Sequence, residues 1–206
     1  MTDATTITFL PGAGGRGSFW APVAQRLAGL GATRCLDWPG FGGAPPDPSI
    51  GSLDDLHRWT LSRLPPGPAD VVAQSMGGVV AVLLALGQPD RLRRLVLVAT
   101  SGGVDVGALG GADWRPEYLA ALPGVPRWFV NDRTDLSGRL GEVRVPTLLL
   151  WSDVDPVSPL AVAHLLLERL PDARLEILRG GSHAFAGERP DEVAALIRTH
   201  LAASGP

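Results

Sequence analysis

The sequence of 206 residues contains no lysine and a single cysteine, and each shortage excludes a type of chemistry. Because all 18 basic residues are arginine, the chain offers no side-chain amine for a Schiff base and no lysine for a phosphate-binding P-loop. The lone Cys35 excludes an intramolecular disulfide and a zinc site made of several cysteines, and its apolar surroundings predict a buried structural thiol. No apolar run approaches the roughly 20 residues that a membrane-spanning helix needs.

Charge is also scarce in this chain. Only 19% of the residues are charged and the net charge is −3, which argues against an electrostatic surface for nucleic acid. The length and the apolar content of 45% are typical of one globular domain, which we expect to span residues 1–206. The first residues lack the positively charged region of a secretory signal, so we expect a cytoplasmic protein. The bias toward arginine, alanine, glycine and proline indicates a high-GC, bacterial genome.

Short apolar runs alternate with segments of helical spacing along most of the chain. The apolar runs predict buried strands at residues 7–10, 33–36, 70–73, 95–100, 147–151 and 174–178. Helices are predicted at residues 18–30, 52–64, 76–86, 160–170 and 191–202. This alternation predicts an α/β fold of three layers, with a mostly parallel sheet of about six strands. Residues 101–145 break the rhythm, and we expect them to form a short lid insertion with one helix near residues 117–122.

Candidate catalytic residues follow the predicted strands. A glycine-rich loop comes after the first strand, Ser75 after the third, Asp153 and Asp155 after the fifth, and His183 after the sixth. Because ligands bind beyond the carboxyl ends of the strands in an open parallel sheet, we expect these side chains to meet at one edge. The chain order of serine, aspartate and histidine is the order found in α/β-hydrolases.

The stretch VVAQSMGG, residues 71–78, has the pattern of a nucleophile elbow, in which a serine occupies a sharp turn between a strand and a helix. The alternative is that Ser75 only begins a helix, since serine is frequent at helix N-termini. As a nucleophile, Ser75 needs His183 to take its proton and a carboxylate to orient the imidazole. The N–H groups of Met76 and of the glycine-rich loop, most simply Ala13, then serve as the oxyanion hole.

Five motifs in this order resemble the α/β-hydrolase superfamily. They are FLPGAGG (9–15), DWPGFGG (37–43), AQSMGG (73–78), LLLWSDVDPVSP (148–159) and GGSHAFAGERPDEV (180–193). The likeness is to small lidded carboxylesterases of the pimeloyl-carrier-protein methyl ester carboxylesterase type. The resemblance implies Ser75 as nucleophile, His183 as base and Ala13 and Met76 as the oxyanion hole. It favours Asp155 as the acid over Asp153. It also favours Asp155 over Asp105, which follows the fourth strand, where some relatives have the acid.

The chain departs from the family pattern at several points. Pro11 stands where many relatives have a histidine, and Ala73 replaces the first glycine of the elbow. The sequence begins at the strand that feeds the oxyanion loop, so the first strands of the family are missing or reduced. The short lid makes the transfer of a relative's substrate to this chain unsafe.

The resemblance implies a serine hydrolase that cleaves a carboxylic ester or thioester through an acyl-enzyme, with no cofactor and no metal. Trp114, Trp128 and Phe129 in the predicted lid are candidates for an apolar substrate pocket, together with Tyr118. The expected partner is a small-molecule acyl ester or thioester, and an acyl carrier protein is a candidate through the lid arginines. Neither nucleic acid nor membrane is expected as a partner.

Three other functions stay open at this point. The same triad serves acyltransferases, cofactor-free perhydrolases and C–C bond lyases, because the fold does not fix the reaction. A hydrolase fold also serves as a binding protein without catalysis. Finally, GAGGRG at residues 12–17 has the G-x-G-x-x-G pattern of a dinucleotide-binding fold, with Asp37 at the spacing of the ribose-binding acid. That reading leaves Ser75, Asp155 and His183 without a role.

Overall fold

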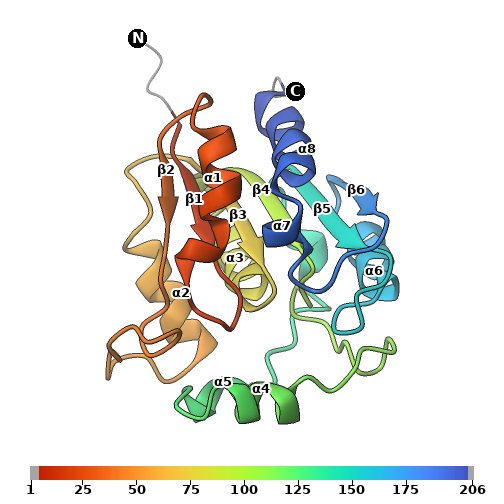
Figure 1. The fold of residues 1–206 in the computed structure, drawn as a ribbon. Helices are drawn as coiled ribbons and strands as arrows, with labels where there is room; N and C mark the ends of the chain where they lie inside the picture. Colours follow the sequence, from red (N-terminus) through yellow and green to blue (C-terminus); the bar gives the residue numbers. More distant parts are fainter. Residues whose placement is uncertain (1–4, 204–206) are drawn as a thin grey trace.

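The computed structural model describes residues 5–203, which form a sheet with helices on both faces (Figure 1). All pairings in the six-stranded sheet are parallel, and the strand order is β2-β1-β3-β4-β5-β6. The α/β class and the parallel sheet predicted from the sequence are therefore confirmed. The strands are β1 (Ile7–Leu10), β2 (Thr33–Cys35), β3 (Ala69–Gln74), β4 (Leu92–Val98), β5 (Thr147–Ser152) and β6 (Ala173–Leu178).

Eight α-helices accompany these strands in the described part of the chain. They are α1 (Ala21–Leu27), α2 (Leu53–Leu61), α3 (Met76–Gly87), α4 (Arg115–Ala121), α5 (Arg127–Asn131), α6 (Leu160–Arg169), α7 (Phe185–Glu188) and α8 (Pro190–Ala202). None of the helices between residues 5 and 203 combines the length and the apolar character that crossing a membrane requires.

Each face of the sheet carries its own apolar core, because neighbouring strand residues point to opposite sides. On β3, Val71 belongs to the core under α2, α3 and α6, whereas Val72 belongs to the core under α1, α7 and α8. Both side chains are fully buried. Burial on both faces explains why the strands appear in the sequence as continuous apolar runs instead of alternating patterns.

Two helix starts show how local sequence sets the boundaries. Ser52 caps α2: its hydroxyl accepts the N–H of Asp55 at 3.1 Å and donates to the Asp55 carboxylate at 2.7 Å. The helix expected over residues 18–30 is present only in part, as α1. A 3₁₀ turn at Gly17–Trp20 precedes α1, and Pro22 falls in the first turn of α1, where proline is tolerated because no intrahelical partner is lost.

The segment between β4 and β5, residues 99–146, is here called the β4–β5 segment. Its helices α4 and α5 lie beyond the arrowheads of the strands, at the bottom of Figure 1. The expected helix near residues 117–122 is present as α4, whereas α5 was not predicted. The rings of Trp114 and Phe129 stack here with centroids 5.3 Å apart, and Tyr118 meets both rings edge-on.

At the amino-terminal ends of β3 and β4, a polar cluster lies against the C-terminal end of α8. Arg93 forms an ion pair with Asp70 and donates to the carbonyl of Leu201, while Arg94 donates to the carbonyl of Ala203. Cations at this place offset the negative end of the helix dipole. Burial raises the pKa of Asp70 in spite of the Arg93 guanidinium beside it. This cluster fixes the last helix and lies away from the strand ends that carry Ser75 and His183.

Candidate active site

Ser75 occupies a strained turn between β3 and α3. Its backbone has φ 52° and ψ −121°, a conformation that costs a non-glycine residue about 1–3 kcal/mol. Hydrogen bonds hold the turn on both sides: the Ser75 N–H donates to Val98 O at 3.1 Å, and the Thr100 hydroxyl donates to Ser75 O at 2.6 Å. The turn thus has the geometry of a nucleophile elbow and not that of an ordinary helix cap, since Ser75 makes no capping hydrogen bond.

Small residues around Ser75 allow the chain to pack this closely. A Cβ on Gly77 would lie 2.5 Å from the carbonyl oxygen of Pro11, so the first turn of α3 and the loop after β1 meet backbone to backbone. Ala73, which replaces the usual first glycine of the elbow, is completely buried in β3. The departure from the family pattern at this position is compatible with the turn.

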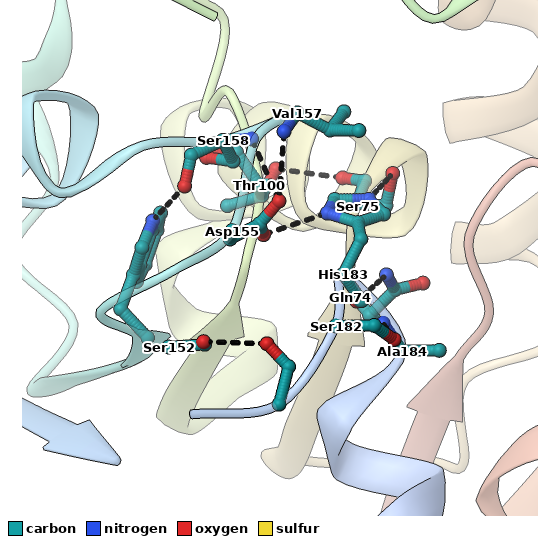
Figure 2. A network of polar contacts seen from close by, with 12 residues as sticks. Gln74, Ser75, Thr100, Ser152, Asp155, Val157, Ser158, Ser182, His183 and Ala184 are labelled. Atoms are coloured by element: carbon teal, nitrogen blue, oxygen red, sulfur yellow. Dashed lines mark hydrogen bonds and ion pairs between the residues drawn. The ribbon is translucent and has the colours of Figure 1, made fainter. Parts of the chain in front are cut away.

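His183 lies between Ser75 and Asp155 in one continuous hydrogen-bond chain (Figure 2). Its Nε2 is 3.0 Å from Ser75 Oγ, and its Nδ1 is 2.7 Å from Asp155 Oδ2. These residues are separated by up to 108 positions in the sequence. The parallel sheet brings them together because each follows the carboxyl end of a different strand.

The Asp155 carboxylate is buried and fixed by backbone hydrogen bonds. Its side chain has no solvent exposure, and its second oxygen, Oδ1, accepts the N–H groups of Val157 at 2.8 Å and Ser158 at 3.1 Å. The other two acids considered from the sequence are engaged elsewhere. Asp153 accepts the Gly180 N–H at 2.6 Å, and Asp105 accepts the N–H of Gly107 at 3.0 Å.

The loop that carries His183 is tied down at its backbone. The Gln74 side-chain amide donates to His183 O at 3.2 Å, and the Ser152 hydroxyl donates to Gly181 O at 2.7 Å. Figure 2 shows both contacts reaching the loop from the ends of β3 and β5. Sequence reasoning missed these two supports and the Thr100 hydroxyl. The available signal was their position, since Gln74 and Ser152 are the final residues of their strands.

Two backbone N–H groups near Ser75 are the candidates for the oxyanion hole. Ala13 and Met76 both line the cavity that contains Ser75 and His183. Within residues 5–203, neither of their N–H groups has a hydrogen-bond partner. Met76 is the first residue of α3, where helix N–H groups are free and the helix dipole favours negative charge. An oxyanion between these donors would have a preorganised site.

The cavity above Ser75 has a volume of about 760 Å³ and mostly apolar walls. Of the four aromatic residues expected in a substrate pocket, Trp114, Tyr118 and Phe129 line this cavity. Trp128 does not; it lines a neighbouring cavity of about 1100 Å³ beside the glycine-rich loop and packs edge-on against Phe41. Trp128 and Phe129 are neighbours on the short helix α5, and no sequence pattern indicates which of them lines which cavity.

Charges of both signs stand at the rim of the cavity. Arg115 and Arg133 are balanced by Asp105, Asp132 and Asp135 on the same lining. This rim therefore does not by itself select an anionic substrate. No group of three or more histidine, cysteine, aspartate or glutamate side chains suited to a metal occurs in the described part of the chain.

The glycine-rich loop does not have the arrangement of a dinucleotide site. Asp37, the expected ribose-binding acid, accepts the Gly17 N–H at 2.7 Å and so holds the loop itself. The cavity beside this loop is lined by Arg16, Pro46 and Trp128 among others, and Gly14 lines both this cavity and the one above Ser75.

Comparisons with known proteins agree with this geometry. The family model described as "alpha/beta hydrolase fold" matches residues 5–137. A pimeloyl-[acyl-carrier protein] methyl ester esterase of Chromobacterium violaceum is 28% identical, with 95% of this chain and 93% of that protein aligned. The RutD protein of Azorhizobium caulinodans, which is named as a carbamate hydrolase, is also 28% identical, over 91% of this chain and 87% of that protein.

A solved structure supports the fold in the same way. The crystal structure of a hydrolase from Pseudomonas aeruginosa PA01 superposes with a TM-score of 0.81 at 22% identity, covering 98% of this chain and 92% of that one. The family model covers well over half of the sequence. The chain therefore belongs to the alpha/beta hydrolase family of enzymes.

Proposed function

We propose that the protein is a serine hydrolase that cleaves a carboxylic ester or thioester through an acyl-enzyme intermediate. The observation that carries this proposal is the continuous hydrogen-bond chain from Ser75 through His183 to the buried Asp155, at the wall of an apolar cavity. A serine hydroxyl is a weak nucleophile, and an imidazole at 3.0 Å is placed to remove its proton as it attacks.

In the acylation half of the reaction, Ser75 Oγ attacks the carbonyl carbon and its proton passes to His183 Nε2. Asp155 stabilises the imidazolium and keeps the tautomer in which Nδ1 carries the hydrogen. The carbonyl oxygen becomes an oxyanion that the N–H groups of Ala13 and Met76 bind. The intermediate collapses as the bond to the alcohol or thiol breaks, and His183 returns the proton to that leaving group.

Deacylation repeats these steps with water as the nucleophile. His183 takes a proton from water, the hydroxide adds to the acyl-enzyme, and the carboxylic acid leaves as Ser75 regains its proton. Each oxyanion-hole donor contributes on the order of 3 kcal/mol to the stability of the transition state. The whole cycle uses only groups of this chain, and it has no step that requires a cofactor.

The cavity favours an apolar acyl group. Val79, Trp114 and Phe129 line it, and its volume of about 760 Å³ has room for a medium-length chain. The curated relatives add one chemical class, because several are named as esterases of a methyl ester on an acyl carrier protein. We extend that to this chain only as a carboxylic ester or thioester, with an acyl carrier protein as a candidate partner.

The test is covalent labelling combined with ester turnover. A fluorophosphonate should label the protein once, at Ser75, and p-nitrophenyl esters of increasing chain length should show a burst of p-nitrophenol. Ser75→Ala should abolish both signals, because no other serine has a histidine at hydrogen-bond distance in residues 5–203. Ser62→Ala, which removes an exposed hydroxyl at the end of α2, is the matched control and should keep both. Labelling that survives in Ser75→Ala would refute the proposal.

A further inference from the structure

The loop that holds the proposed oxyanion donor is built almost entirely of glycine. Ala13 lies in the middle of a turn from Gly12 to Gly15, which the Gly15 N–H closes on Gly12 O at 3.0 Å. Gly15 has φ 75°, and a Cβ there would collide with Phe41. Glycine restricts the backbone very little, so the direction of the Ala13 N–H depends on what holds this turn from outside.

Three successive carbonyl groups of the loop are tied down. The Trp38 indole donates to Pro11 O at 2.9 Å, and the turn itself engages Gly12 O. The third tie comes from the β4–β5 segment: the Tyr118 hydroxyl on α4 donates to Ala13 O at 2.8 Å. Tyr118 is 105 residues away from Ala13 in the sequence. Its bond to Ala13 O is the single hydrogen bond between α4 and this loop within residues 5–203.

The Tyr118 side chain is itself held in place. Its ring meets Trp114 edge-on at 5.3 Å and Phe129 edge-on at 6.0 Å. Burial raises the pKa of Tyr118 to about 12, so the hydroxyl keeps its proton, and can donate it, throughout the pH range of ordinary assays. The hydroxyl therefore acts as a fixed donor that does not switch off below about pH 11.

A second set of contacts also joins the β4–β5 segment to the oxyanion loop. Phe129 and Trp128 on α5 pack edge-on against Phe41 at 5.9 and 5.8 Å. Phe41 in turn lies directly against Gly15, and its N–H donates to Trp38 O at 3.1 Å. The aromatic cluster of the β4–β5 segment thus supports the oxyanion loop as well as lining the cavity.

We propose that Tyr118 is a positioning residue: its hydrogen bond fixes the peptide group that carries Ala13 O, the Gly15–Gly12 bond fixes the preceding peptide group that carries the Ala13 N–H, and together they hold that N–H in the orientation that binds the oxyanion. This inference rests on the proposed function, since it assigns a role within the same reaction. The oxyanion hole is then complete only when α4 is packed over the site. The contribution of Tyr118 appears in the transition state, where the oxygen carries its negative charge.

Tyr118→Phe tests this directly, because it removes one hydroxyl and keeps the ring among its aromatic neighbours. Losing an oxyanion donor outright costs about 10²–10³-fold in rate, so freeing the loop while keeping the donor should cost about tenfold in the acylation rate. Affinity for a trifluoromethyl ketone, which adds to Ser75 and forms an oxyanion, should fall by the same factor. Affinity for the matching methyl ketone, which stays largely uncharged, should change less than twofold.

Thr60→Val is the matched control. It also removes one buried hydroxyl hydrogen bond, from Thr60 to Leu56 O at 2.7 Å within α2, and Thr60 lines neither cavity. Both variants should lose comparable thermal stability, and only Tyr118→Phe should lose acylation rate and trifluoromethyl ketone affinity. If Tyr118→Phe matches the control in both measurements, the residue is a packing element and the proposal is wrong.

The failure of this inference is distinguishable from the failure of the proposed function. If the unsubstituted protein reacts with a fluorophosphonate at Ser75 and Tyr118→Phe reacts at the same rate, only the positioning role is refuted. If the unsubstituted protein is not labelled at Ser75, the serine hydrolase proposal itself is refuted. Fluorophosphonate addition also develops negative charge on an oxygen, so its rate reports on the same hole.

Discussion

Replacement of Asp155 by asparagine should invert the hydrogen bonding of His183 without changing the shape of the site. The two oxygens of Asp155 have different partners: Oδ1 accepts two backbone N–H groups, from Val157 and Ser158, and Oδ2 faces His183 Nδ1. An asparagine keeps its oxygen on the two N–H donors, because its NH₂ group is itself a donor and cannot accept their hydrogen bonds. The NH₂ group must then point at His183.

The consequence falls on the tautomer of the histidine. With an NH₂ donor opposite Nδ1, His183 accepts at Nδ1 and carries its hydrogen on Nε2, which faces Ser75 Oγ at 3.0 Å. An Nε2–H group cannot take the serine proton, so general-base catalysis is lost while the fold is kept. We expect kcat for acylation to fall by about 10⁴-fold, the size of this effect in serine proteases, which corresponds to about 5 kcal/mol of activation free energy.

The assay is the burst phase with a p-nitrophenyl ester, which follows acylation directly. Asp153→Asn is the matched control, because it makes the same chemical change two residues away at a carboxylate that accepts from Gly180 and has no contact with His183. Asp153→Asn should remain within a few-fold of the unsubstituted protein. A loss below about 30-fold in Asp155→Asn would refute the reasoning, because the tautomer argument requires a near-complete loss of the base.

Two further predictions concern stability. Gly77→Ala should lower the free energy of unfolding by about 1–3 kcal/mol in urea titrations, because the new Cβ would lie 2.5 Å from Pro11 O; an unchanged midpoint would contradict the close packing. His200→Gln should flatten the pH dependence of the free energy of unfolding. Burial lowers the pKa of His200 to about 4, whereas the same histidine in the unfolded chain binds a proton near pH 6.5. Up to about 3 kcal/mol of stability is therefore lost from the unsubstituted protein as the pH falls from 6.5 to 4. The same slope in both proteins would contradict this.

The sequence predicted which side chains would meet because the fold is parallel. Ser75, Asp155 and His183 each follow an apolar run, and a parallel sheet places the ends of such runs at one edge. Position after the strand did not separate Asp153 from Asp155, and it was the family resemblance that favoured Asp155 as the acid. The structure distinguishes them by hydrogen bonds, since only Asp155 has an oxygen within reach of His183.

The contacts of the β4–β5 segment could not be foreseen in the same way. Its path depends on loops rich in glycine and proline, whose conformations depend on distant packing more than on local preference. Trp128 and Phe129 are adjacent in the sequence, yet only Phe129 lines the cavity above Ser75. The bond from Tyr118 to Ala13 likewise joins two residues that no periodicity relates.

The three members of the hydrogen-bond chain are anchored very unequally. Ser75 sits between a central strand and α3, inside the best-buried part of the sheet, whereas His183 follows β6, which pairs with β5 alone in residues 5–203. An edge strand with half-exposed side chains opens at a lower free energy than the core strands do. Sub-global opening of β6 would withdraw the base while the nucleophile and its elbow stay folded. We therefore expect an inactive, largely native state below the global unfolding free energy, and loss of activity should report on that state earlier than any probe of the sheet.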